Sequence, residues 1–139
     1  MLLGLEHVGM TVSDMDRAVA FYCELLGLRL ALRKSVDRGE LAFFDTGAGM
    51  LELFAPASSK VDRFRDVPVG EAGLRHLTFA FSSVDAIFET LEQASVEIVE
   101  RPRDAHNREM ISRVAFVRDD DGILVELIER APGRDSSAL

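Results

Sequence analysis

The octapeptide LEHVGMTV, residues 5–12, recurs in the same chain as LRHLTFAF, residues 74–81. The two copies align without a gap at an offset of 69 residues, since 76 − 7 = 69 for the histidines. The offset continues beyond the octapeptide, where Asp16 matches Asp85 (85 − 16 = 69). A fixed internal offset with matching residue types indicates two copies of one structural unit.

Each copy alternates as a β-strand does. In residues 5–12 the even-numbered side chains are mostly apolar, whereas His7, Gly9 and Thr11 point the other way, because successive strand residues face opposite sides of a sheet. The apolar face is expected to pack on a helix. The opposite face is small and polar, which is typical of a functional site.

Similar elements follow each copy. In the first module, residues 4 to about 57, an apolar stripe from Met15 to Leu26 predicts a helix that starts after Ser13 and Asp14 and ends at Gly27. Three further strands are predicted at residues 28–32, 41–45 and 50–55. This order is βαβββ.

The second module, residues 74 to about 130, has the same order. A helix follows Ser82 and Ser83, and strands are predicted at residues 96–100, 111–118 and 123–128, with a polar loop over residues 101–109. A linker, about residues 58–73, joins the modules, and the tail 131–139 is expected to be disordered. The prediction is one α+β domain, residues 1–139, built from two paired βαβββ modules.

Composition excludes several classes of function. The 139 residues carry a net charge of −8, which argues against nucleic acid as a partner. We find no apolar run long enough to cross a membrane and no signal peptide at the start. Cys23 is the single cysteine, so no internal disulfide can form. These features predict a soluble, cytoplasmic protein that does not bind a membrane.

The last strand of each module contains one carboxylate in an apolar run. Glu52 lies in MLELF and Glu126 in LVELI, where an unpaired buried charge would be costly. With His7 and His76 they make two imidazoles and two carboxylates, a set that suits one divalent ion such as Ni, Co, Zn, Mn or Fe. The absence of thiolates favours a catalytic over a structural site. The other interpretation of each residue is a hydrogen-bonded histidine or an exposed glutamate at a strand edge.

His106 has no counterpart in the first module. It lies in the polar loop and is either a surface histidine or a residue that contacts substrate. Arg101 and Arg103 in the same loop could bind a carboxylate or phosphate, or simply be solvated.

Several segments together resemble the vicinal oxygen chelate superfamily, which includes glyoxalase I, methylmalonyl-CoA epimerase, extradiol dioxygenases and the fosfomycin and bleomycin resistance proteins. The resemblance covers nearly the whole chain. It rests on HVG (7–9) leading to DMDRAVAFY (14–22), on LEL (51–53), on RHLTF (75–79) and on DDGILVEL (120–127).

The resemblance implies a fold in which the paired modules curl their strands into a cup around a metal ion. A full ligand set of His7, Glu52, His76 and Glu126 is similar to that of glyoxalase I and, more loosely, the epimerase. Those enzymes move a proton on the carbon next to a carbonyl. By this resemblance Glu126 is the first candidate for the base and Glu52 the second, and the substrate is a small thioester, thiohemiacetal or 2-oxo compound.

Other details leave alternatives open. Bacterial glyoxalase I carries an arginine and an asparagine that hold glutathione where this chain has Thr11 and Pro56, whereas the epimerase has a histidine in the loop of His106. One alternative is an Fe(II) ring-cleaving dioxygenase, in which Glu52 would not be needed as a metal ligand. The other is a small-molecule binding or resistance protein, which would bind its ligand without turnover. Members of the superfamily often dimerise, so a homodimer is expected.

Overall fold

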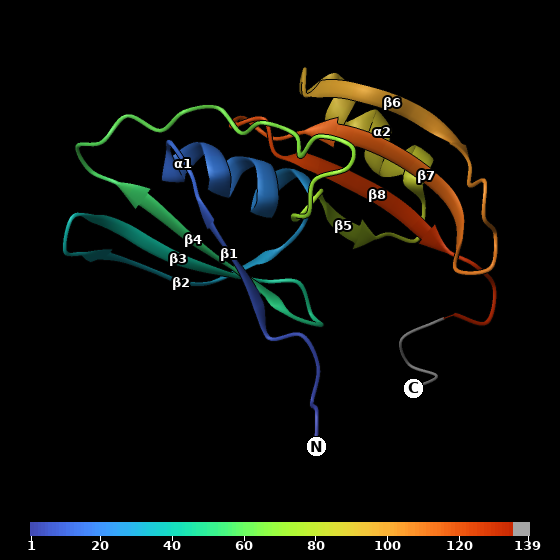
Figure 1. The fold of residues 1–139 in the computed structure, drawn as a ribbon, viewed down its shortest axis with the longest axis horizontal. Helices are drawn as coiled ribbons and strands as arrows, with labels where there is room; N and C mark the ends of the chain where they lie inside the picture. Colours follow the sequence, from blue (N-terminus) through green and yellow to red (C-terminus); the bar gives the residue numbers. More distant parts are fainter. Residues whose placement is uncertain (135–139) are drawn as a thin grey trace. The chain divides into compact units, whose positions relative to one another are not determined.

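The chain divides into two compact units, Met1–Arg63 and Phe64–Leu139. In the computed structural model of the chain, residues 1–134 are the described residues (Figure 1). The division falls within the linker predicted for residues 58–73.

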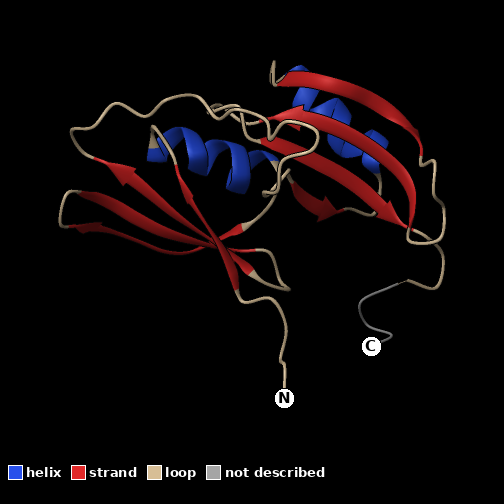
Figure 2. Cartoon of the chain, viewed as in Figure 1, coloured by secondary structure: helices blue, strands red, loops and turns tan. Residues whose placement is uncertain are grey.

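The first unit is a four-stranded sheet with one helical segment. Strand β1 (His7–Thr11) is followed by helix α1 (Met15–Ala18), which continues as the π-helix η1 (Val19–Leu25). Strands β2 (Arg29–Val36), β3 (Gly39–Asp45) and β4 (Met50–Pro56) complete the unit. The order in the sheet is β1-β4-β3-β2, with β1 parallel to β4 and the other neighbours antiparallel (Figure 2).

The second unit repeats this arrangement. It consists of β5 (Leu77–Ala80), α2 (Val84–Gln93), β6 (Glu97–Asp104), β7 (Ile111–Arg118) and β8 (Leu124–Arg130). The order is β5-β8-β7-β6, again with the first and last strands parallel. The predicted α+β class with two βαβββ modules is therefore confirmed. The cup around a metal ion stays a prediction.

Each helix packs on one face of the sheet of its own unit, which we call the helix face. In the first unit Met15 and Tyr22 are fully buried, as are Phe44 and Leu53 of the sheet. In the second unit the fully buried side chains include Val84, Leu91, Val117, Val125 and Leu127. Burial alternates along β4 and β1, as the sequence pattern predicted.

Equivalent residues cap the two helices. The side chain of Asp14 accepts a hydrogen bond from the backbone N–H of Arg17, and the Ser83 hydroxyl accepts one from that of Ala86, each over 3.1 Å. The two caps obey the repeat offset (83 − 14 = 69). The sequence predicted two possible N-cap residues at the start of each helix. In the structure the second of them is the cap in both helices. Gly27 follows the first helix with φ +91°, a conformation that favours glycine.

Three predicted boundaries were wrong. Strand β2 ends at Val36, four residues beyond the predicted end at residue 32 (36 − 32 = 4). Residues 101–104, assigned to a polar loop, continue strand β6 in spite of Pro102. Strand β6 is an edge strand, where the missing N–H of proline breaks no necessary ladder bond, and its pairing with β7 shows two register irregularities. The ordered chain also extends past residue 130, since Ala131 is buried and its N–H donates to the carbonyl of Met110. The rest of the predicted tail, residues 135–139, lies outside the described residues.

No helix among residues 1–134 has the length and apolar character needed to cross a bilayer.

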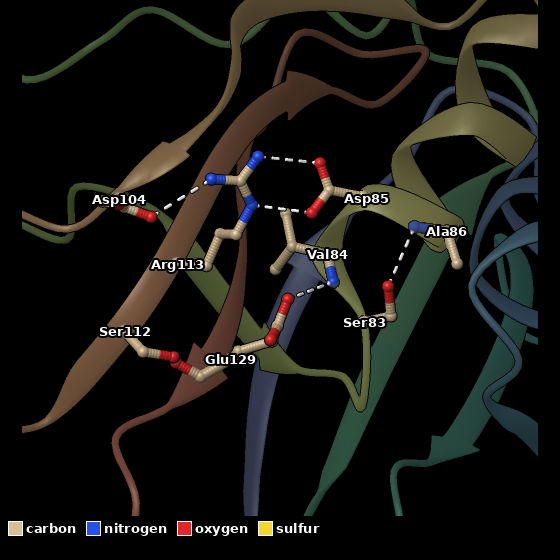
Figure 3. A network of polar contacts seen from close by, with 8 residues as sticks. All are labelled: Ser83, Val84, Asp85, Ala86, Asp104, Ser112, Arg113 and Glu129. Atoms are coloured by element: carbon tan, nitrogen blue, oxygen red, sulfur yellow. Dashed lines mark hydrogen bonds and ion pairs between the residues drawn. The ribbon is translucent and has the colours of Figure 1, made fainter.

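An ionic network joins α2 to its sheet (Figure 3). The Arg113 guanidinium donates to both carboxylate oxygens of Asp85, over 2.6 and 2.8 Å, and to Asp104 over 3.2 Å. The Glu129 carboxylate accepts from the backbone N–H of Val84, at the first turn of the helix. The hydrogen bonds from Arg113 lower the pKa of Asp85.

Replacing Ser83 by alanine is expected to destabilise the second unit. The substitution removes the acceptor for the N–H of Ala86, and loss of an N-cap costs about 1 kcal/mol. Urea unfolding followed by circular dichroism measures the effect. The neighbouring Ser82→Ala is the matched control, because exposed Ser82 is not the cap. Equal losses in the two variants would contradict the assignment.

The Asp85–Arg113 pair is expected to contribute a stability that disappears in acid. The pKa of Asp85 is lower in the folded protein than in the unfolded chain. The contribution of the pair to the free energy of unfolding is therefore complete above the pKa that Asp85 has in the unfolded chain, and it is lost as the pH falls through the pKa that Asp85 has in the folded protein. Asp85→Asn should therefore be less stable than wild type at pH 7, by an amount that shrinks below about pH 4. Urea unfolding at both pH values tests this, with Asp62→Asn as an exposed control outside the network. A difference independent of pH would contradict it.

Candidate metal centre

The two predicted histidines occupy the same place in the two strand registers. In the first unit Gly9 lies opposite Glu52, and His7 precedes Gly9 by two residues. In the second unit Thr78 lies opposite Glu126, and His76 precedes Thr78 by two. Residues two apart share a face of a strand, so each histidine lies diagonally beside its glutamate. We call this side of each sheet the histidine face; it is opposite the helix face.

In the first unit the structure brings His7 and Glu52 together. The His7 Nε2 atom lies 3.5 Å from Glu52 Oε2, and the side chains are 39% and 38% exposed. The other ring nitrogen of His7, Nδ1, contacts the carboxylate of Glu6. This hydrogen bond is the main reason that the pKa of His7 is raised.

The second unit contains the matching pair, in a more enclosed setting. The His76 Nε2 atom lies 3.3 Å from Glu126 Oε2, and the Glu126 side chain is only 10% exposed. The Thr78 hydroxyl lies 2.9 Å from His76 Nδ1 and donates to Glu126 Oε2 over 3.2 Å. The second glutamate therefore has a hydrogen-bond donor as well as a histidine neighbour.

A phenylalanine from the third strand of each unit completes each pair. The Phe43 and His7 rings meet edge-on, with centroids 5.8 Å apart at 81°. Phe116 and His76 meet in the same way, 5.9 Å apart at 79°. Phe43 lies opposite Glu52 in the ladder, and Phe116 lies opposite Glu126. Each histidine ring is thus limited in its orientation by an aromatic neighbour.

These distances are compatible with a shared metal ion. Imidazole and carboxylate ligands bind zinc at about 2.0 to 2.2 Å, which puts two adjacent ligand atoms roughly 3.0 to 3.5 Å apart for angles between about 90° and 110°. Both N–O separations, 3.5 and 3.3 Å, lie in this range. Each pair therefore fits two neighbouring ligands of one ion.

The structure brings the four predicted ligands together as two pairs. Within residues 1–134, no three or more His, Cys, Asp or Glu side chains form a group that could hold a metal ion. Each pair lies within a single unit, so the four-ligand site stays a prediction.

His106, the predicted substrate contact, lies in the segment 105–110 between β6 and β7 and is exposed. The matching segment of the first unit, residues 37–38, is four residues shorter (6 − 2 = 4). The sequence offsets show the same difference. Phe116 follows Phe43 by 73 residues (116 − 43 = 73), whereas His76 follows His7 by 69, which is four fewer (73 − 69 = 4). His106 thus lies in an insertion specific to the second module, which explains why it has no counterpart.

Two charged neighbours lie near His106. Arg103 donates hydrogen bonds to Glu100 and is the main cause of the lowered pKa of that carboxyl, to which His106 adds a smaller electrostatic contribution. In the ladder Glu100 lies opposite Phe116, which in turn lies opposite Glu126. Glu100 therefore continues the ladder row that contains Phe116, Glu126 and Thr78.

Sequence reasoning missed the residues that contact the histidines. Phe43 and Phe116 lie in the matching tripeptides AFF (42–44) and AFV (115–117), so the repeat could have revealed them. Glu6 and Thr78 differ between the modules, so the repeat gave no signal for either.

Comparison with known proteins is consistent with this architecture. Residues 4–127 match the family model described as the glyoxalase/bleomycin resistance protein/dioxygenase superfamily. An uncharacterised protein of Bacillus subtilis, YqjC, is 33% identical over 132 residues, which cover 90% of this chain and 91% of that protein.

Two further relatives resemble the chain over nearly its full length. A probable lactoylglutathione lyase of Synechocystis is 24% identical over 131 residues, covering 94% of this chain and 98% of that protein. The crystal structure of a glyoxylase/bleomycin resistance protein/dioxygenase domain from Frankia is 25% identical, with a TM-score of 0.76, and covers 94% of this chain and 99% of that one. The resemblance predicted from the sequence is therefore confirmed: the chain belongs to the glyoxalase/bleomycin resistance protein/dioxygenase superfamily, the vicinal oxygen chelate proteins.

Proposed function

We propose that this protein is a divalent-metal-dependent enzyme that moves a proton on the carbon next to a carbonyl. Its substrate would be a small thioester, thiohemiacetal or 2-oxo compound, and the reaction an isomerisation, epimerisation or lyase reaction of the glyoxalase I or epimerase kind. The observation that carries the proposal is the pair of equivalent His–Glu contacts, His7 with Glu52 and His76 with Glu126.

In this proposal His7, Glu52, His76 and Glu126 bind one ion, which is Ni, Co, Zn, Mn or Fe. A bound divalent ion would stabilise negative charge that develops on a substrate oxygen. Two carboxylates offset the charge of such an ion, and four protein ligands leave coordination positions open on a six-coordinate metal.

The proton transfer itself falls to a glutamate. A carboxylate within reach of the substrate carbon can take its proton and return it to the same or the neighbouring carbon. Glu126 is the first candidate and Glu52 the second. Both lie on the histidine face of their sheets, and the side chain of Glu52 is the more exposed. His106 is proposed to contact the substrate from the segment that is specific to the second module.

The names of distant relatives support the lyase class but do not identify the substrate of this protein. The Synechocystis relative is named a probable lactoylglutathione lyase, whereas the more similar Bacillus subtilis protein has no assigned activity. We further propose that the protein acts as a homodimer, which size-exclusion chromatography with light scattering can test.

Metal content tests the proposed site directly. Wild-type protein, purified without added metal and reconstituted separately with Ni, Co, Zn, Mn and Fe(II), is expected to retain about one ion per chain by elemental analysis. Glu52→Ala removes a proposed ligand. It should lose affinity by more than the roughly 10- to 100-fold that follows loss of an outer-shell partner. Glu71→Ala, at an exposed glutamate outside both pairs, is the control and should bind metal as wild type does.

Two outcomes would contradict the four-ligand site. Full metal retention in Glu52→Ala with a preference for Fe(II) would instead favour the dioxygenase, and no stoichiometric metal in any form would favour a binding protein.

The reaction class is tested by exchange of a substrate proton. Metal-loaded wild type, incubated in D₂O with 2-oxoaldehyde–thiol adducts or acyl-CoA epimers, is expected to incorporate deuterium next to the carbonyl, as NMR detects. Glu126→Gln keeps the size of the side chain but removes the base, and a general base contributes about 10²- to 10⁴-fold to rate. Exchange at the wild-type rate in metal-loaded Glu126→Gln would show that Glu126 is not the base.

A further inference from the structure

Thr78 connects the two members of the second His–Glu pair. Its hydroxyl lies 2.9 Å from His76 Nδ1 and 3.2 Å from Glu126 Oε2. The strand register explains both contacts, since Thr78 follows His76 by two residues on the same face and lies directly opposite Glu126. Neither contact requires a residue from outside the second unit.

The hydrogens of this group can be assigned from its chemistry. A hydroxyl has one hydrogen to donate, and an ionised carboxylate can only accept. Both contacts are favourable only if Thr78 donates to Glu126 and accepts from a protonated Nδ1 of His76. A neutral imidazole carries one N–H, so its other nitrogen, Nε2, then carries a lone pair.

That lone pair is available to bind a metal ion. His76 Nε2 and Glu126 Oε2 lie 3.3 Å apart, and in the neutral ring both are electron-pair donors. Two such atoms repel each other unless a metal ion lies between them. The alternative is a proton on Nε2, but in a neutral ring this would leave Nδ1 without its hydrogen, and the Thr78 hydroxyl could then donate to only one of its two neighbours. The hydrogen bond from Nδ1 therefore leaves the ring in the one neutral tautomer that can bind a metal through Nε2.

The first unit lacks this arrangement. Gly9 occupies the position equivalent to Thr78 (78 − 9 = 69) and has no hydroxyl. Nδ1 of His7 instead contacts the carboxylate of Glu6, whose side chain is 67% exposed. The two histidines thus have equivalent positions but different outer partners, a strand hydroxyl in one unit and an exposed carboxylate in the other.

We propose that Thr78 is a positioning residue that holds His76 in its Nδ1–H tautomer, with Nε2 free for a metal ion, and holds Glu126 beside it. The proposal builds on the proposed metal-binding role of His76 and Glu126. Thr78 itself is not a ligand; it acts by orienting the two groups that are. Its counterpart for His7 is Glu6, so the repeat conserves the geometry of the ligands and not the residues that orient them.

The tautomer can be measured without metal or substrate. Long-range ¹H–¹⁵N NMR spectra of the metal-free protein, recorded at a pH where the His76 ring is neutral, are expected to show the Nδ1–H form in wild type. Thr78→Val keeps the shape of the side chain but removes the hydroxyl, and should shift His76 away from this form. Thr78→Ser restores a hydroxyl and should retain it.

Metal affinity provides the second measurement. Competition between the protein and a chelator for Zn²⁺ is expected to show a loss of about 10- to 100-fold in Thr78→Val and little change in Thr78→Ser. Thr90→Val makes the same chemical change on α2, at a hydroxyl that bonds the backbone of its own helix, and controls for general destabilisation.

An unchanged His76 tautomer in Thr78→Val would overturn the proposal, as would equal losses of zinc affinity in Thr78→Val and Thr90→Val. Failure of the proposed function is a different result: wild type would then bind no metal, while the NMR spectra would still decide whether Thr78 fixes the ring.

Discussion

The parallel pairing of the first and last strand of each unit is the constraint on which the candidate site depends. Parallel neighbours cannot be joined by a tight turn, so the helix and the two middle strands form the connection between them. This pairing sets a histidine from the start of the unit diagonally beside a glutamate from its end. A shift of one residue in either register would move the glutamate to the helix face, into the apolar core.

The helix face and the histidine face have separate tasks. Buried apolar side chains on the helix face stabilise each unit, and the Arg113 network ties α2 to the same side. The opposite face holds a histidine, a glutamate and a phenylalanine in each unit. Consecutive side chains of a strand point to opposite faces of the sheet. The same strands can therefore carry polar groups on the histidine face and apolar core residues on the helix face.

The sequence was sufficient to predict the two modules, because a gapless offset of 69 and the alternation in residues 5–12 are both local patterns. The same repeat predicted which His and Glu belong to each pair. It could not predict that β6 continues through Pro102, because tolerance of proline depends on the strand lying at a sheet edge. It also could not reveal Thr78 or Glu6 as histidine partners, because these contacts depend on strand register and side-chain geometry.

The irregular outer strands have a consequence for solubility. Strands β2 and β6 form the edges farthest from the histidine strands, and each is irregular in its pairing. β2 carries Arg29, Arg33 and Lys34, and β6 carries Pro102 among charged residues. A flat, uncharged edge would offer its free N–H and C=O groups to strands of other molecules. Charge, proline and broken register therefore make these two edges poor templates for the addition of a strand from another molecule.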